Sequence, residues 1–197
     1  MKKVERSELL ALGAYEEIRE RFRARIIAEK KRRRFQPCGE LSVVFENTDT
    51  VLFQVQEMLR TERITSEAAI AHELETYNEL IPGEDQLSAT MFVEIPERET
   101  RERRLVELSG LENALSIEWR GGSAPAITES RSVQEGQTTA VHYLKFSLGR
   151  EGMAALRAAA TPGPGEVFFV VNHPALSMRA PLPVEVVRSL VADQAPR

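Results

Sequence analysis

FENTDTVLFQVQEMLRTERITSEAAIAHELETYNELIP, residues 45–82, contains two successive helix signals and decides the fold. The tripeptide NTD at 47–49 offers good N-cap residues and predicts a helix over about 50–62. TS at 65–66 can cap a second helix that runs to about Leu80, and a Pro-Gly pair then ends it. Each helix carries one apolar stripe, formed by Val51, Leu52, Val55, Met58 and Leu59 in the first and by Ile70, Leu74, Tyr77 and Ile81 in the second. The stretch therefore predicts an αα-hairpin.

On the N-terminal side of the hairpin, the sequence predicts one long helix and one short strand. Ser7 can cap a helix to about Arg33, with apolar residues at helical spacing along one face. The basic run KKRRR (30–34) falls in its last turn, and QPCG breaks it. LSVVF (41–45) alternates as a strand does.

After residue 85 the spacing of apolar residues changes from the helical period of 3.6 residues to a period of two residues, which indicates strands. LSATMFVEI, LSIEW, TTAVHYLKFSL and EVFFVV read as strands, and GG at 121–122 suggests a hairpin into APAITES. Short helices are predicted over 96–110 and 151–159 and after Pro183. The expected fold class is α+β: an N-terminal long helix and αα-hairpin packed with a mostly antiparallel sheet of five or six strands. Residues 1–85 would form the helical part and 86–197 the sheet part of one compact domain.

Composition narrows the classes of protein further. Residues 1–35 hold 12 Lys/Arg and 6 Asp/Glu, a net charge of +6, whereas the remaining 14 basic and 24 acidic residues give −10. No apolar run approaches the roughly 20 residues that cross a bilayer, and the single Cys38 excludes an internal disulfide. These features predict a cytoplasmic protein without a membrane segment. They are compatible with a monomer and with a homo-oligomer. The sequence has neither a phosphate-loop motif nor a GxSxG nucleophile motif.

Four residues are candidate ligands for iron or another divalent metal: Glu62, Glu73, His142 and His173. The competing interpretation is structural. Most hairpin acids, Glu57 among them, lie away from the apolar stripe and are expected to face water, while Glu62 can act as a cap. His142 shares a strand face with apolar residues and is expected to point into the core. A metal- or haem-dependent redox enzyme that uses His142 or His173 with carboxylates remains an alternative.

The basic N-terminal helix offers candidate partner-binding residues: Arg23, Lys30, Arg32, Arg33 and Arg34. A regulator that contacts nucleic acid is another alternative, with arginines on phosphates and Phe35 stacked on a base. Acidic residues interleave with the basic ones and can form i,i+4 pairs along the helix, which argues against nucleic acid.

Five blocks occur in order along the chain: YEEIRERFRARIIAEKKRRR, FENTDTVLFQVQEMLRTER, ELETYNELIP, ATMFVEIPE and VHYLKFSL. Through them the sequence, over roughly residues 3–190, resembles the bacterial family called domain of unknown function three-five-zero-one. The resemblance implies no catalytic residue. It implies genes encoded near a rubrerythrin and near an iron–sulfur oxidoreductase resembling heterodisulfide reductase. The leading hypothesis is therefore a non-enzymatic accessory or adaptor protein in a rubrerythrin-linked redox or peroxide-stress system.

Overall fold

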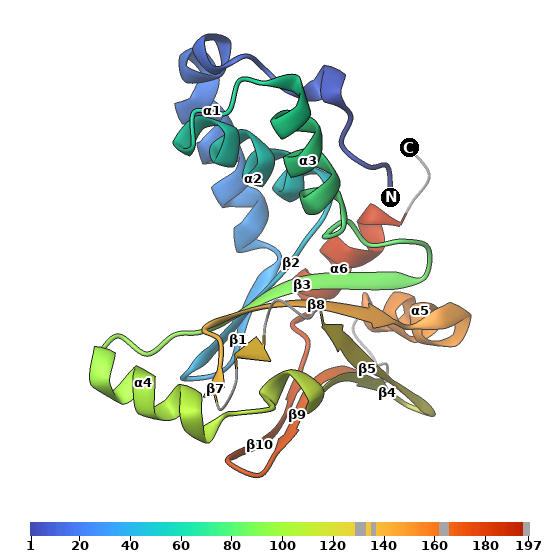
Figure 1. The fold of residues 1–197 in the computed structure, drawn as a ribbon. Coiled ribbons are helices and arrows are strands. Elements are labelled where there is room, and N and C mark those ends of the chain that lie inside the picture. Colours follow the sequence, from blue (N-terminus) through green and yellow to red (C-terminus); the bar gives the residue numbers. More distant parts are fainter. Residues whose placement is uncertain (129–132, 135–136, 162–165, 195–197) are drawn as a thin grey trace.

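A strongly curved antiparallel sheet forms the centre of the molecule (Figure 1). The computed structural model describes residues 1–128, 133–134, 137–161 and 166–194. Within these ranges the main sheet has eight strands in the order β1-β2-β3-β8-β5-β4-β9-β10. Their bounds are β1 Arg34–Cys38, β2 Leu41–Phe45, β3 Gln86–Val93, β4 Leu115–Trp119, β5 Gly122–Thr128, β8 Val141–Ser147, β9 Val167–His173 and β10 Leu176–Pro181. A separate two-stranded pair joins β6 (Val133–Gln134) to β7 (Gln137–Thr138).

The sheet curls until it is nearly a barrel. The two edge strands, β1 and β10, lie next to each other. Phe35 of β1 and Phe169 of β9 meet at 5.8 Å between ring centroids, although their strands stand near opposite ends of the strand order. Phe169 also contacts Phe146 of β8 at 6.3 Å. Alternate residues of each strand therefore fill one common interior, as the period of 2 requires.

Three helices form a unit of their own on one side of the sheet: α1 (Leu12–Lys31), α2 (Thr48–Thr61) and α3 (Glu67–Asn78) (Figure 1). Asn47 caps α2 by accepting from the Thr50 amide, and Ser66 caps α3 by accepting from the Ala69 amide. α2 contacts both α1 and α3. The unit has its own apolar cluster, formed by Val4, Leu9, Val51, Val55, Leu59, Ile70, Leu80 and Ile81.

The remaining helices are α4 (Arg98–Glu107), α5 (Gly149–Ala159) and α6 (Val184–Asp193), with short 3₁₀ turns at Arg6–Glu8 and Leu111–Asn113. α5 and α6 pack against the barrel core through Leu156, Val187 and Leu190. Gly152 allows the close approach of α5, because a Cβ there would lie 2.8 Å from Trp119 Cη2. In the described part of the chain, no helix is both long and apolar enough to cross a membrane.

The α+β class and the αα-hairpin are confirmed, whereas the predicted strand number of five or six is wrong. β1 and β10 account for the two missing strands. The predicted helix from Ser7 is also shorter: a 3₁₀ turn occupies Arg6–Glu8, and α1 begins at Leu12 with no side-chain cap. Leu9, between the two segments, is extended and buried in the apolar cluster of the helical unit.

Candidate functional site

The four predicted metal ligands lie in different parts of the structure. Glu62 is exposed just after α2, and Glu73 is half-buried on α3. His142 and His173 both lie on the inner face of the barrel wall, on β8 and β9. Among the described residues, no three His, Cys, Asp or Glu side chains come together as a metal site.

His142 is fully buried, so the prediction that it points into the core is confirmed. Its Nε2 lies 3.2 Å from the Thr138 hydroxyl, which in turn lies 3.1 Å from the buried carboxylate of Glu112. Burial lowers the pKa of His142, and the nearby Glu112 carboxylate only partly opposes this effect. The imidazole is therefore neutral, as suits a buried ring in a hydrogen-bonded chain.

His173 uses both ring nitrogens for structural hydrogen bonds. Its Nδ1 accepts from the Ala175 amide at 3.1 Å, and its Nε2 lies 2.9 Å from the Ser109 carbonyl oxygen. The proton is therefore on Nε2, which donates to Ser109. These bonds hold the β9–β10 turn against the segment after α4, and neither nitrogen is left for a ligand.

Glu57 does not face water as expected, because α1 covers that side of α2. The Tyr15 hydroxyl donates to Glu57 at 2.6 Å, and the Arg19 guanidinium donates to both carboxylate oxygens at 2.8 Å. Tyr15 itself is fully buried. The Arg19 guanidinium, helped by the Tyr15 hydroxyl, holds the pKa of Glu57 below its usual value. Burial and the Glu57 carboxylate raise the pKa of Tyr15. This contact fastens α1 to the hairpin.

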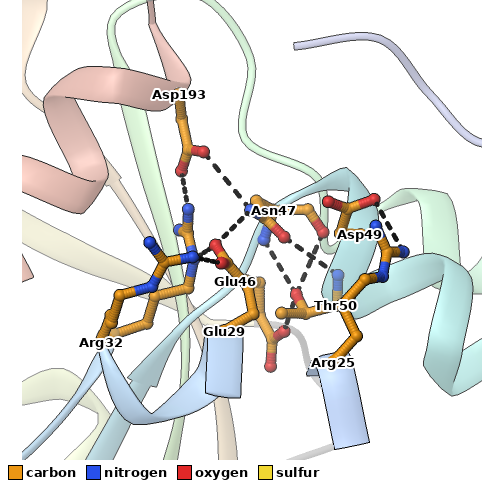
Figure 2. A network of polar contacts seen from close by, with 9 residues as sticks. Arg25, Glu29, Arg32, Glu46, Asn47, Asp49, Thr50 and Asp193 are labelled. Carbon is orange, nitrogen blue, oxygen red and sulfur yellow. Dashed lines mark hydrogen bonds and ion pairs between the residues drawn. The ribbon is translucent and has the colours of Figure 1, made fainter. Parts of the chain in front are cut away.

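A second buried ion cluster, the Arg33 cluster, joins the helical unit to the barrel (Figure 2). Arg33 is 1% exposed and lies 2.6 Å from a carboxylate oxygen of both Glu29 and Asp193. The side-chain amide of Asn47 donates to the same two carboxylates at 3.3 Å. Burial alone would raise the pKa of Glu29, but Arg33 and Arg32 hold it below its usual value. The cluster thus connects α1, the start of α2 and α6.

Next to the Arg33 cluster, Glu46 is a buried carboxylate held by neutral donors. The hydroxyls of Thr50 and Thr90 donate to it at 2.5 and 2.6 Å, and the Gln54 amide donates at 3.1 Å. Thr90 belongs to β3, whereas Thr50 and Gln54 belong to α2. The junction between the two apolar clusters is therefore polar, and hydrogen bonds from α2 and β3 hold the Glu46 carboxylate in place.

Three half-buried carboxylates with lowered pKa values make the stability of the protein depend on pH. Glu29, Glu40 and Glu57 each bind an arginine, with Arg104 as the partner of Glu40 at 2.7 Å. Their pKa values are higher in the unfolded chain, so the unfolded chain takes up protons first as the pH falls. We expect the free energy of unfolding to decrease below about pH 5, where unfolded glutamates begin to protonate. Urea titrations between pH 7 and pH 3 measure this decrease.

The variant Glu57→Gln isolates one part of this pH dependence. At pH 7 it should lower the free energy of unfolding by about 1–2 kcal/mol, because it weakens charged hydrogen bonds to Arg19 and Tyr15. The deficit should become smaller as the pH falls toward 3, because protonation of Glu57 in the wild-type protein removes the same charged hydrogen bonds that the variant lacks. An equal deficit at both pH values would contradict the assigned role of Glu57.

The outward face of α1 carries cations that bind no carboxylate in the described part of the chain. Arg23, Lys30 and Lys31 surround Ile27, which is 52% exposed, and form what we call the α1 basic face. None of the three cations has an ion pair within the described ranges, whereas Glu16 and Glu20, nearer the helix start, contact Arg60 and Arg19. The charges of the C-terminal half of α1 are therefore available to a partner.

The other predicted partner-binding residues differ in their surroundings. Arg32 is exposed and pairs with Glu29. Arg34 is exposed and lies over the Phe92 ring at 5.9 Å. Arg33 is buried in its cluster, so its side chain is not offered to a partner. No local sequence signal separates Arg33 from its neighbours, because one of its carboxylate partners, Asp193, lies at the far end of the chain.

Comparisons with known proteins agree with this fold. The family model described as Protein of unknown function (DUF3501) matches residues 3–194. The structure is similar to the 1.90 Å crystal structure of a novel protein of unknown function from Burkholderia pseudomallei K96243, with a TM-score of 0.89 and 31% sequence identity. The match covers 98% of this chain and 100% of that chain. No curated protein matches the sequence.

Proposed function

We propose that this chain, which belongs to the family described as Protein of unknown function (DUF3501), is a cytoplasmic, non-enzymatic accessory protein that docks onto an acidic partner. The α1 basic face carries the proposal. It combines an exposed apolar side chain, Ile27, with three cations that no carboxylate of the described residues neutralises. An apolar centre within a charged rim is the usual anatomy of a protein–protein interface, and the charges steer a partner of opposite sign.

The partner belongs, in this proposal, to a rubrerythrin-linked redox or peroxide-stress system. The family resemblance points to two candidates, a rubrerythrin and a heterodisulfide-reductase-like iron–sulfur oxidoreductase. The two helices of the αα-hairpin would act as the rigid support of α1, since Glu57 of α2 binds Tyr15 and Arg19. A rigid support reduces the conformational entropy that α1 loses on docking.

Nucleic acid is a less suitable partner for the same helix. Phe35, the residue that would stack on a base, is only 7% exposed and packs inside the barrel against Phe45 and Phe169. Exposed acidic side chains also lie about two and about three turns before Ile27, at Glu20 and Glu16, where they would repel phosphates.

The proposal is tested with the purified rubrerythrin and the purified oxidoreductase of the same genome. We expect one of them to bind the chain, and the triple variant Arg23→Glu/Lys30→Glu/Lys31→Glu to bind it at least about tenfold more weakly. The matched control is Arg103→Glu/Arg150→Glu/Arg157→Glu, which makes the same charge change at exposed positions of α4 and α5. Calorimetry at two salt concentrations measures the affinities. Higher salt should weaken the wild-type and control complexes strongly and the complex of the α1 variant only slightly, because that variant has lost the attracting charges.

Three results would overturn the proposal: no binding to either protein, equal loss of affinity in both triple variants, or tight binding of duplex DNA that the α1 variant alone abolishes.

A further inference from the structure

A cavity of about 600 Å³ lies between the end of α1 and α6, beside the Arg33 cluster. Its size is that of pockets that hold small molecules. The lining consists of Glu29, Arg32, Arg33, Glu185, Arg188, Ser189, Ala192 and Asp193. In Figure 2, Asp193 of α6 lies above the ion cluster and Arg32, just after α1, lies below it. Apart from Arg32 and Arg33, which were predicted to bind a protein partner, this lining was not predicted from the sequence to bind anything, because α6 and α1 are far apart along the chain.

Two carboxylates of the lining, Glu29 and Asp193, already pair with Arg33, whereas two buried donors in or beside the lining have no acceptor among the described residues. Glu29 accepts from Arg32, Arg33 and Asn47. Asp193 accepts from Asn47 and forms an ion pair with Arg33 through Oδ2, which has no hydrogen-bond partner among the described residues. In contrast, the Nη1 of Arg33, a lining residue that is only 1% exposed, has no hydrogen-bond partner within the described ranges. The side-chain amide of Gln194, at the end of α6, is a second buried donor without a partner.

The rim adds two groups that a ligand can reach. Arg188 is exposed and lines the cavity, and its Nε donates to the Ala160 carbonyl oxygen at the end of α5 at 3.0 Å. The adjacent Ser189 contributes a half-buried hydroxyl. Glu185, one turn earlier on α6, is exposed and places a negative charge at the same rim. The charge of Glu185 disfavours a ligand with many anionic groups, so a small ligand with one or two acidic groups suits the rim.

We infer that this cavity binds a small organic acid or phosphate ester through its anionic oxygens. Guanidinium groups bind carboxylate and phosphate oxygens in paired, charge-assisted hydrogen bonds. Arg188 and Ser189 hold the anionic group, and Arg33 contributes to the same lining a donor that lacks an acceptor among the described residues. A buried cationic donor without an acceptor is costly, so an incoming oxygen gains more there than at an exposed arginine. The inference does not depend on the proposed docking function.

Titration with two probes, inorganic phosphate and succinate, at constant ionic strength tests the inference. Backbone amide shifts of α6 report binding at the cavity. We expect saturable binding of at least one probe by the wild-type protein, with an affinity about tenfold lower in Arg188→Gln. Ser189→Ala should weaken binding as well. The control, Arg150→Gln, removes an exposed cation from α5 and should bind as the wild type does. Arg188 is exposed, so its replacement leaves the fold intact.

The outcome also identifies the acidic group. Saturation by phosphate alone assigns a phosphate ester, saturation by succinate alone assigns a carboxylate, and saturation by both assigns any small oxyanion. The inference is wrong if neither probe saturates, or if Arg188→Gln and Arg150→Gln bind the probes equally well.

Discussion

We expect Arg33→Met to lower the free energy of unfolding by about 3–5 kcal/mol, because it removes the cation from a buried ion cluster. Methionine fills a similar volume but leaves Glu29 and Asp193 without their common partner. The two carboxylates are only 16% and 11% exposed as side chains, so water cannot replace the guanidinium well. The loss should appear in urea unfolding followed by circular dichroism.

Arg32→Met is the matched control for Arg33→Met. Arg32 also pairs with Glu29, but its side chain is 67% exposed. We therefore expect a loss of no more than about 1 kcal/mol, as for other surface ion pairs. Adding Asp193→Asn to Arg33→Met should restore part of the stability, since it removes one uncompensated charge. Equal effects of Arg32→Met and Arg33→Met would contradict the buried cluster.

Phe169→Ala should cost about 3–5 kcal/mol of unfolding free energy, the range for large aromatic side chains in a core. The ring is fully buried and contacts both Phe35 and Phe146. Removing the ring leaves a cavity where β9 faces β1 across the interior of the curled sheet. Phe168→Ala is the control, because this neighbouring ring faces the other side of β9, under the guanidinium of Arg179.

A double-mutant cycle between Phe35→Ala and Phe169→Ala tests the near-closure of the barrel. The two strands are far apart in an open sheet, and only a curled sheet brings the rings to 5.8 Å. We expect a coupling energy of about 0.5–1.5 kcal/mol, as for other aromatic pairs. Strictly additive losses would mean that the rings do not touch in solution.

The sequence predicts elements with clear periodicity and misses those without it. The hairpin helices carry both caps and stripes, and β3 and β8 alternate cleanly, so these were predicted close to their observed bounds. β1 was missed because RFQPC contains a proline and follows a basic helix, so it resembles a helix end. β10 was missed although LSMRAP alternates, because the run is short, ends in proline and becomes a strand by pairing with β9.

The interpretation of single polar residues depends on neighbours that periodicity does not reveal. Glu57 was placed in water because α2 was treated as a helix with one buried face. In the structure α1 covers the second face, where Glu57 meets Arg19 and the Gln56 side chain bonds the backbone of Leu10. Arg33 was expected at the surface for the same reason, since its partner Asp193 belongs to the last helix. Pairings across such long sequence separations leave no local pattern.

The most direct test of the docking hypothesis is lysine acetylation of the free chain and of its complex with the acidic partner. The chain has five lysines, Lys2, Lys3, Lys30, Lys31 and Lys145, so mass spectrometry can follow each of them. Docking through the α1 basic face predicts slower acetylation of Lys30 and Lys31 in the complex and unchanged rates at the other three. Unchanged rates at Lys30 and Lys31, together with protection of another lysine, would contradict it.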